Sequence, residues 1–199
     1  MKKVVIAVVT LFITFCLTGC QFKDETTDIS NYDKIEFHSG ETWLTFEVFP
    51  KEISESVIVN GFYYLYLPIL WVNPDIQVFL SCTYNQVDFE NEISRLAALS
   101  SSKEGYNTKF VKYDEEIFEF PAYYTFYAFF HSFEYALLDY ETNTIIYVSM
   151  QYQEVKDIHF DNKYLPINYA TEYKHDSESP NSFSMYMFDN EDRIPSKQD

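Results

Sequence analysis

Residues 135–152 read YALLDYETNTIIYVSMQY, and this stretch decides the fold. Two runs rich in apolar, aromatic and β-branched residues, 135–140 and 144–152, flank the polar triplet Glu141-Thr142-Asn143. Runs of this composition joined by three residues are typical of an antiparallel β-hairpin. We therefore predict a hairpin here, with further strands before it in the chain.

The residues before this hairpin are also rich in strand-forming side chains. Residues 118–135 are the densest aromatic segment of the chain; helical spacing can be drawn through it, but β-propensity favours an extended segment. Residues 108–113 and 76–84 are predicted strands, and the second contains Cys82. Cys82 as a nucleophile needs an activating histidine or a positive environment, and its sequence neighbours supply neither, so a buried inert thiol is expected.

Two further hairpins are expected between residues 34 and 67. Apolar and polar residues alternate in residues 34–50 on both sides of Ser39-Gly40-Glu41, and Pro50 ends the pattern. Residues 57–59 and 62–67 flank Asn60-Gly61, a strong hairpin-turn signal, although a loop followed by a single strand is the alternative. Residues 68–75 hold two prolines around an apolar run, which predicts a loop folded on the core or a partner-binding tip containing Trp71.

One helix is expected in the body of the chain, at about residues 88–99. Asp88 is a suitable N-cap, and one face is apolar through Phe89, Ile93, Leu96 and Ala97. Residues 157–169 are expected to be irregular because of Pro166, and residues 185–188 to add an edge strand. The predicted fold class is α+β, an antiparallel β-sheet built from hairpins with one packed α-helix, after an N-terminal signal helix.

The N-terminus has the order of regions found in an export signal. Lys2 and Lys3 precede an apolar run, residues 4–17, which ends at Leu17-Thr18-Gly19-Cys20. The run is shorter than the roughly 20 apolar residues that a spanning helix needs. These last four residues resemble the lipobox of bacterial lipoproteins. The resemblance implies cleavage after Gly19 and a diacylglyceryl group on the Cys20 thiol; an ordinary secretory signal cleaved nearby is the alternative.

This reading divides the chain into four parts. Residues 1–19 are the signal peptide, and residues 20–33 are the lipidated cysteine with a flexible acidic tether. Residues 34–188 form a single α+β domain, and residues 189–199 a disordered tail. The expected location is the cell membrane, with the protein lipid-anchored on the extracytoplasmic face.

The net charge and the cysteine content indicate which partners to expect and what stabilises the fold. Removing Lys2 and Lys3 changes the net charge from −17 to −17 − 2 = −19, which repels nucleic-acid phosphates, so no nucleic-acid partner is expected. Loss of Cys16 with the signal and acylation of Cys20 leave Cys82 as the only mature thiol. Without an intramolecular disulfide, stability has to come from a core, which the aromatic content of 20% can supply.

The residues of the mature chain contain no strong catalytic or metal-binding motif. Its glycines are too few for a phosphate-binding loop, and no G-x-S-x-G is present. The histidines are scattered, at positions 38, 131, 159 and 175, and the acidic run at residues 189–192 lacks the glycine of a calcium loop. We predict no catalytic residues, no metal ligands and no cofactor.

Two functions are compatible with these features. The first is a non-catalytic binding module at the cell envelope, which contacts a protein or polysaccharide partner through exposed aromatics, with Trp43 and Trp71 as candidate residues. The rival is a surface hydrolase that acts on wall or glycan material through a carboxylate pair near Trp43 or Trp71. A deep pocket with two facing carboxylates would favour the rival, and a domain that only spaces or shields the envelope is a third reading.

Overall fold

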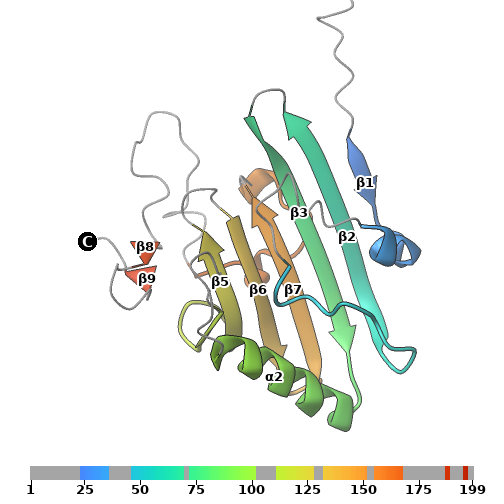
Figure 1. The fold of residues 1–199 in the computed structure, drawn as a ribbon, viewed down its shortest axis with the longest axis vertical. Coiled ribbons are helices and arrows are strands. Elements are labelled where there is room, and N and C mark those ends of the chain that lie inside the picture. The colour runs from blue at the N-terminus through green and yellow to red at the C-terminus, as the bar shows by residue number, and fades with distance from the viewer. Residues whose placement is uncertain are drawn as a thin grey trace, which may run out of the picture.

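A seven-stranded antiparallel β-sheet is the framework of the protein. The computed structural model describes residues 23–35, 46–69, 72–101, 111–127, 132–151, 155–167, 187–188 and 195–196. Among these residues the sheet has the strand order β1-β2-β3-β7-β6-β5-β4 (Figure 1). Its strands are β1 (Asp24–Thr26), β2 (Ile58–Ile69), β3 (Val72–Thr83), β4 (Lys112–Asp114), β5 (Ala122–Tyr127), β6 (Ser132–Asp139) and β7 (Thr144–Gln151). The expected class, an antiparallel sheet with a packed helix, is confirmed for the described residues; the expected signal helix lies outside them.

The predicted hairpin of residues 135–152 is confirmed at the centre of the sheet. Strands β6 and β7 pair in antiparallel register from Asp139 opposite Thr144 to Ser132 opposite Gln151. The turn is fixed by Asp139, whose Oδ1 accepts a hydrogen bond from the backbone N–H of Glu141, and by Asn143 in the left-handed region at φ 53°. All eight residues of β7 are buried, because the strand lies between β3 and β6 and both of its faces are covered.

The two faces of the sheet bury separate apolar clusters. The first face packs against the helix, against the 3₁₀-helix η1 (Ile29–Lys34) and against residues 46–57, with Tyr32, Phe49 and Tyr147 among its fully covered aromatics. The second face packs against residues 117–120 and 158–165, which include the short 3₁₀-helix η4 (Asn162–Tyr164). Because both faces of the sheet are covered, the central strands bury apolar side chains on both sides and show no alternation of apolar and polar residues.

The predicted helix is confirmed as α2 (Gln86–Ser101) and is two residues longer at each end than expected. Its cap is Asn85 rather than Asp88, because the Asn85 side-chain oxygen accepts the backbone N–H of Asp88 at 3.0 Å. Phe89 and Leu96 are buried against the first face of the sheet, as the apolar face of the sequence predicts. The helix lies across the end of the sheet where β3, β6 and β7 meet their turns (Figure 1).

The predicted hairpin turn at Asn60-Gly61 is wrong. Strand β2 continues through these residues with a β-bulge between Val59 and Gly61, and it pairs with β3 on both sides of the bulge. A Cβ at position 61 would lie 3.2 Å from Cε1 of Phe79, so glycine provides room for the neighbouring ring. Pairing with β3 therefore outweighs the local turn preference, as in the single-strand alternative.

The loop expected at residues 68–75 is wrong for its described residues, because Pro68 and Ile69 end β2 and residues 72–75 begin β3. Ile69 pairs directly with Val72, so the strands of this long hairpin reach nearly to its tip. Pro68 lies at a register shift and beyond the residues of β2 that pair with β1, and Pro74 lies beyond the residues of β3 that pair with β7. Each proline thus belongs to a part of its strand that has only one neighbouring strand among the described residues, where a missing N–H is tolerated.

The expected flexible tether, residues 20–33, contains regular structure in its described part, residues 23–33. Asp24–Thr26 form β1 on the edge of the sheet, and Ile29–Lys34 form η1, capped by Asp28 and anchored by buried Tyr32. The expected hairpin at residues 34–50 is not seen in its described parts, because Lys34 belongs to η1 and residues 46–50 form no strand. Its turn, residues 39–41, lies outside the described residues.

The remaining expectations concern the second half of the chain. The extended reading of residues 118–135 is confirmed by β5 and the start of β6, and the strand near residues 108–113 is found as β4. Of the residues expected to be irregular, 157–169, Asp157 ends η3 (Val155–Asp157) and residues 158–167 are irregular apart from η4. Residues 187–188 form β8 (Met187–Phe188), which pairs with β9 (Pro195–Ser196) in a separate small sheet and not with the edge of the main one.

Candidate functional site

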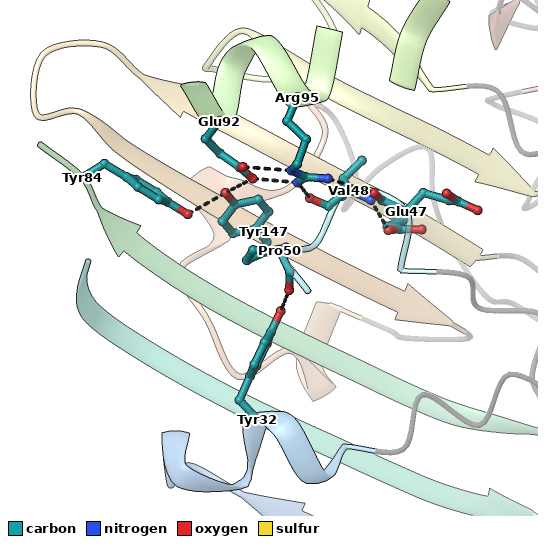
Figure 2. A network of polar contacts seen from close by, with 9 residues as sticks. Tyr32, Glu47, Val48, Pro50, Tyr84, Glu92, Arg95 and Tyr147 are labelled. Atoms are coloured by element: carbon teal, nitrogen blue, oxygen red, sulfur yellow. Dashed lines mark hydrogen bonds and ion pairs between the residues drawn. The ribbon is translucent and has the colours of Figure 1, made fainter. Parts of the chain in front are cut away.

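An irregular segment, residues 46–50, crosses the first face of the sheet and is held there by long-range hydrogen bonds, among them a 3.4 Å bond from Nη1 of Arg95 to the Glu47 carbonyl. The Val48 N–H donates to Oε1 of Glu134 on β6 at 2.7 Å, and the Val48 carbonyl accepts from Nη2 of Arg95 on α2 at 2.6 Å. The Pro50 carbonyl accepts from the Tyr32 hydroxyl at 2.5 Å (Figure 2). Val48 is fully buried, so the segment acts as a structural bridge between η1, α2 and the sheet.

Beside this segment, four side chains form a connected polar network under α2. Both oxygens of Glu92 accept from Arg95, at 2.8 Å from Nε and 2.6 Å from Nη2. Oε1 of Glu92 also accepts from the Tyr147 hydroxyl at 2.7 Å, and this hydroxyl lies 2.8 Å from that of Tyr84 (Figure 2). The network joins the helix to β7 and to the residue that follows β3.

Burial and neighbouring charges shift the pKa values of Tyr84, Tyr147 and Arg95 in the directions that keep the hydrogen bonds of the network intact. Burial raises the pKa of Tyr147 and of Tyr84 far above the ordinary value, and the nearby Glu92 carboxylate adds to both shifts. Burial alone would lower the pKa of Arg95, but its hydrogen bonds to Glu92 outweigh this and raise it. The tyrosines therefore stay neutral and the guanidinium charged at every physiological pH.

A cleft of about 340 Å³ opens between α2 and residues 50–57, next to this network. Its walls combine carboxylates with a few apolar groups: Pro50, Glu52, Ile53, Ser54, Val57, Tyr84, Asp88, Asn91, Glu92 and Arg95. Oδ2 of Asp88 accepts from the Ser56 hydroxyl at 2.8 Å and from Nδ2 of Asn85 at 2.7 Å. The bond from Ser56 ties the two walls together, whereas the bond from Asn85 stays within the first turn of α2.

A cluster of tyrosines lies on the surface near the β4 edge of the sheet. The rings of Tyr113 and Tyr123 have centroids 5.0 Å apart, and the Tyr113 hydroxyl donates to Oε1 of Glu115 at 2.7 Å. Tyr140 packs edge-on against Phe89 at 5.7 Å. Tyr113 is 43% exposed and Tyr140 53% exposed, so these are the described aromatics most available to a partner.

The site residues proposed from the sequence lie outside the part of the chain that the structure describes. These are Cys20, Trp43 and Trp71. The expectation for Cys82 can be examined: its side chain is fully buried in β3, and burial raises the pKa of the thiol to about 12. A thiol in this state is protonated and inaccessible, in agreement with an inert core residue.

The acidic and histidine clusters named from the sequence do not gather into a metal site within the described residues. Oδ1 of Asp114 accepts the backbone N–H groups of Glu116 and Ile117, which makes the run at residues 114–116 a turn. His159 stacks on the Tyr63 ring at 4.6 Å, and the other histidines lie outside the described residues.

The sequence reasoning missed the four residues of the polar network and the cleft beside it. One local signal was available, because Glu92 and Arg95 are spaced i, i+3 on the predicted helix and Arg95 is one of two arginines in the chain. Nothing in the local sequence indicated that Tyr84 and Tyr147, which are 63 positions apart, share a hydrogen bond.

No family model, no curated protein and no solved structure gives a significant match. In the described part of the chain, no helix combines the length and the apolar character needed to cross a bilayer.

Proposed function

We propose that this chain is an exported lipoprotein, anchored to the extracytoplasmic face of the cell membrane through Cys20, and that its folded part is a non-catalytic binding module at the cell envelope. The single observation that carries the anchor is the sequence Leu17-Thr18-Gly19-Cys20 directly after the apolar run. Two acyl chains on one cysteine provide stable attachment, because a single chain holds only marginally.

The acidic cleft supports the binding role. Its volume of about 340 Å³ falls within the range typical of sites for small ligands or single side chains. Arg95 offsets the charge of Glu92 in its wall, and Glu52 and Asp88 leave the lining with a net negative charge, which favours a cationic group such as an amine or a basic side chain of a protein partner. Ile53 and Val57 add apolar contact for the carbon chain that carries such a group.

The hydrogen bonds of the cleft favour binding over hydrolysis. A carboxylate pair that cleaves glycosidic bonds needs one group able to exchange a proton with the substrate. Both oxygens of Glu92 already accept from Arg95, and one accepts from Tyr147 as well. Asp88 is engaged with Ser56 and Asn85. These carboxylates serve as fixed negative charge and as structural acceptors.

The anchor is tested by membrane fractionation and mass spectrometry. The wild-type protein is expected in the membrane fraction through a high-salt wash, with a mature chain that starts at residue 20 and carries a modified thiol. Cys20→Ala removes the acylated sulfur and should release the protein to the soluble fraction. Retention of this variant in the washed membrane would contradict the anchor.

The binding role is tested by cross-linking in the native cell and identification of the captured molecule. Asn91→Trp places a bulky ring in the cleft and Glu52→Arg reverses a charge on its rim, so both should abolish a capture that depends on the cleft. The matched controls are Asn162→Trp and Glu119→Arg, because both residues are exposed and belong to the segments that cover the second face of the sheet. Equal capture by all four variants would exclude the cleft.

A further inference from the structure

Three tyrosines from separate elements meet on the first face of the sheet, beside its β4 edge. Tyr113 of β4 lies opposite Tyr123 of β5 in the register, and Tyr123 belongs to the apolar cluster of this face. Tyr140 follows β6 and packs edge-on against Phe89 of α2. Burial raises the pKa of Tyr113 and of Tyr123, and the nearby Tyr140 hydroxyl adds to both shifts. The three side chains therefore form one tyrosine surface.

The two exposed rings of the tyrosine surface are held in place from behind. The ring of half-exposed Tyr113 packs on that of buried Tyr123, and its hydroxyl donates to Oε1 of Glu115 at 2.7 Å. The ring of half-exposed Tyr140 is supported by buried Phe89. Rings that are already fixed lose little conformational entropy when a partner packs against them. The tyrosine surface is thus preorganised for binding.

Carboxylates surround this surface. Both exposed tyrosines lie in acidic runs, Tyr-Asp-Glu-Glu at residues 113–116 and Asp-Tyr-Glu at residues 139–141. Asp114 and Asp139 accept backbone N–H groups within their own turns, whereas the glutamates of both runs are exposed. The surface combines the electron-rich faces of aromatic rings with negative charge, and both attract a cation.

The cations that β4 and α2 themselves carry are directed elsewhere. Lys112 precedes Tyr113 on β4, so it lies on the other face of the sheet, opposite Tyr124 of the second cluster. Arg95 of α2 is bonded to Glu92 and to the backbone of the segment 46–50. The cation that complements the tyrosine surface therefore has to come from a partner.

We infer that the tyrosine surface is a docking site for an arginine-rich segment of a protein partner. A guanidinium group is flat and weakly hydrated, so it can stack on a ring while its N–H groups reach a carboxylate such as Glu115. Each cation on an exposed ring strengthens binding by a factor of about 2–5, and the surface offers two such rings. The site is separate from the cleft beside α2, whose lining contains none of the three tyrosines.

The experiment titrates the mature chain carrying Cys20→Ser with a capped peptide of alternating arginine and glycine, observed by nuclear magnetic resonance of the tyrosine rings. The acidic chain attracts any basic peptide, so the critical variants leave its charge unchanged. Tyr113→Leu with Tyr140→Leu removes both rings and should weaken binding about tenfold. Tyr113→Phe with Tyr140→Phe keeps the ring faces and should bind within about twofold of the wild type.

Two controls separate the surface from general effects. Glu115→Gln should weaken binding about twofold to threefold, whereas Glu119→Gln, an exposed acid on the segment that covers the second face, should not. The urea midpoint of each variant shows whether it is folded. If the paired leucine variant does not fold, Tyr113→Leu alone replaces it, with an expected weakening of about threefold.

The remaining outcomes would overturn the inference. Equal binding by the leucine and phenylalanine pairs would mean that charge alone attracts the peptide. Loss of peptide binding in Asn91→Trp, with the tyrosine rings intact, would assign the peptide to the cleft and support the proposed function instead. Binding of an uncharged N-acetylglucosamine oligomer in place of the arginine peptide, lost in the leucine pair, would assign the tyrosine surface to a glycan.

Discussion

Replacing Arg95 by methionine tests whether the network under α2 stabilises the fold. The change keeps most of the apolar stem but removes the hydrogen bonds of the guanidinium to both oxygens of Glu92 and to the Val48 carbonyl. Breaking a fully buried ion pair costs about 3–5 kcal/mol, whereas an exposed pair contributes about 0–1 kcal/mol. The side chains of Arg95 and Glu92 are 35% and 12% exposed, so we expect Arg95→Met to lower the free energy of unfolding by an intermediate amount, about 2–3 kcal/mol.

The assay is equilibrium unfolding in urea of the mature chain that carries Cys20→Ser. For a protein of this size the expected loss corresponds to a fall in melting temperature of about 4–12 °C. Glu92→Gln, alone and combined with Arg95→Met, completes a double-mutant cycle. The double variant should lose less free energy of unfolding than the two single variants added together, by about 1 kcal/mol or more.

The control is Lys163→Met, which removes an exposed ion pair. Nζ of Lys163 and Oδ2 of Asp161 lie 3.8 Å apart on the surface, so this change should leave the urea midpoint of unfolding unchanged. The reasoning would be refuted if Arg95→Met lost less than about 1 kcal/mol, or if the two single losses simply added in the double variant. Either result would mean that Glu92 and Arg95 do not interact in the folded protein, despite the short distances between them.

Three further predictions concern the core and the central turn. Cys82 should resist alkylation in the native protein and react in urea, because its thiol is fully buried; reaction at the same rate in both states would contradict the described burial. Burial raises the pKa of Tyr64 and of Cys82 to about 12, above the values of 10.0 and 9.0 expected in the unfolded chain. The unfolded state therefore releases protons first, so the free energy of unfolding should hold up to about pH 9 and fall as the pH rises towards 12, with a smaller fall in Tyr64→Phe. Asn143→Ala should cost about 1 kcal/mol at the left-handed position and Asn143→Gly less, as measured by thermal unfolding; equal losses would indicate that the side-chain contact with Gln86 matters more than the backbone.

The β2–β3 hairpin shows how local signals and long-range pairing compete. Asn60-Gly61 has the sequence of a tight turn, yet β3 pairs with β2 on both sides of it and converts it into a bulge. Turn preferences amount to about 1 kcal/mol, which a strand paired over its whole length exceeds. The prolines at 68 and 74 mark the correct region for the turn, because they are tolerated where a strand lacks a second neighbour.

The sequence alone determined the elements whose pattern is local: the hairpin at residues 135–152, the helix near residues 88–99 and the predominance of strands. These follow from side-chain periodicity and turn chemistry, which act over a few residues. Only the tertiary structure decided that residues 24–26 join the sheet and that η1 packs on its face. The same holds for the bond of Arg95 to Val48 and for that between Tyr84 and Tyr147. Such contacts join residues far apart in the chain, and they form only where packing of the sheet brings these polar groups together and excludes water.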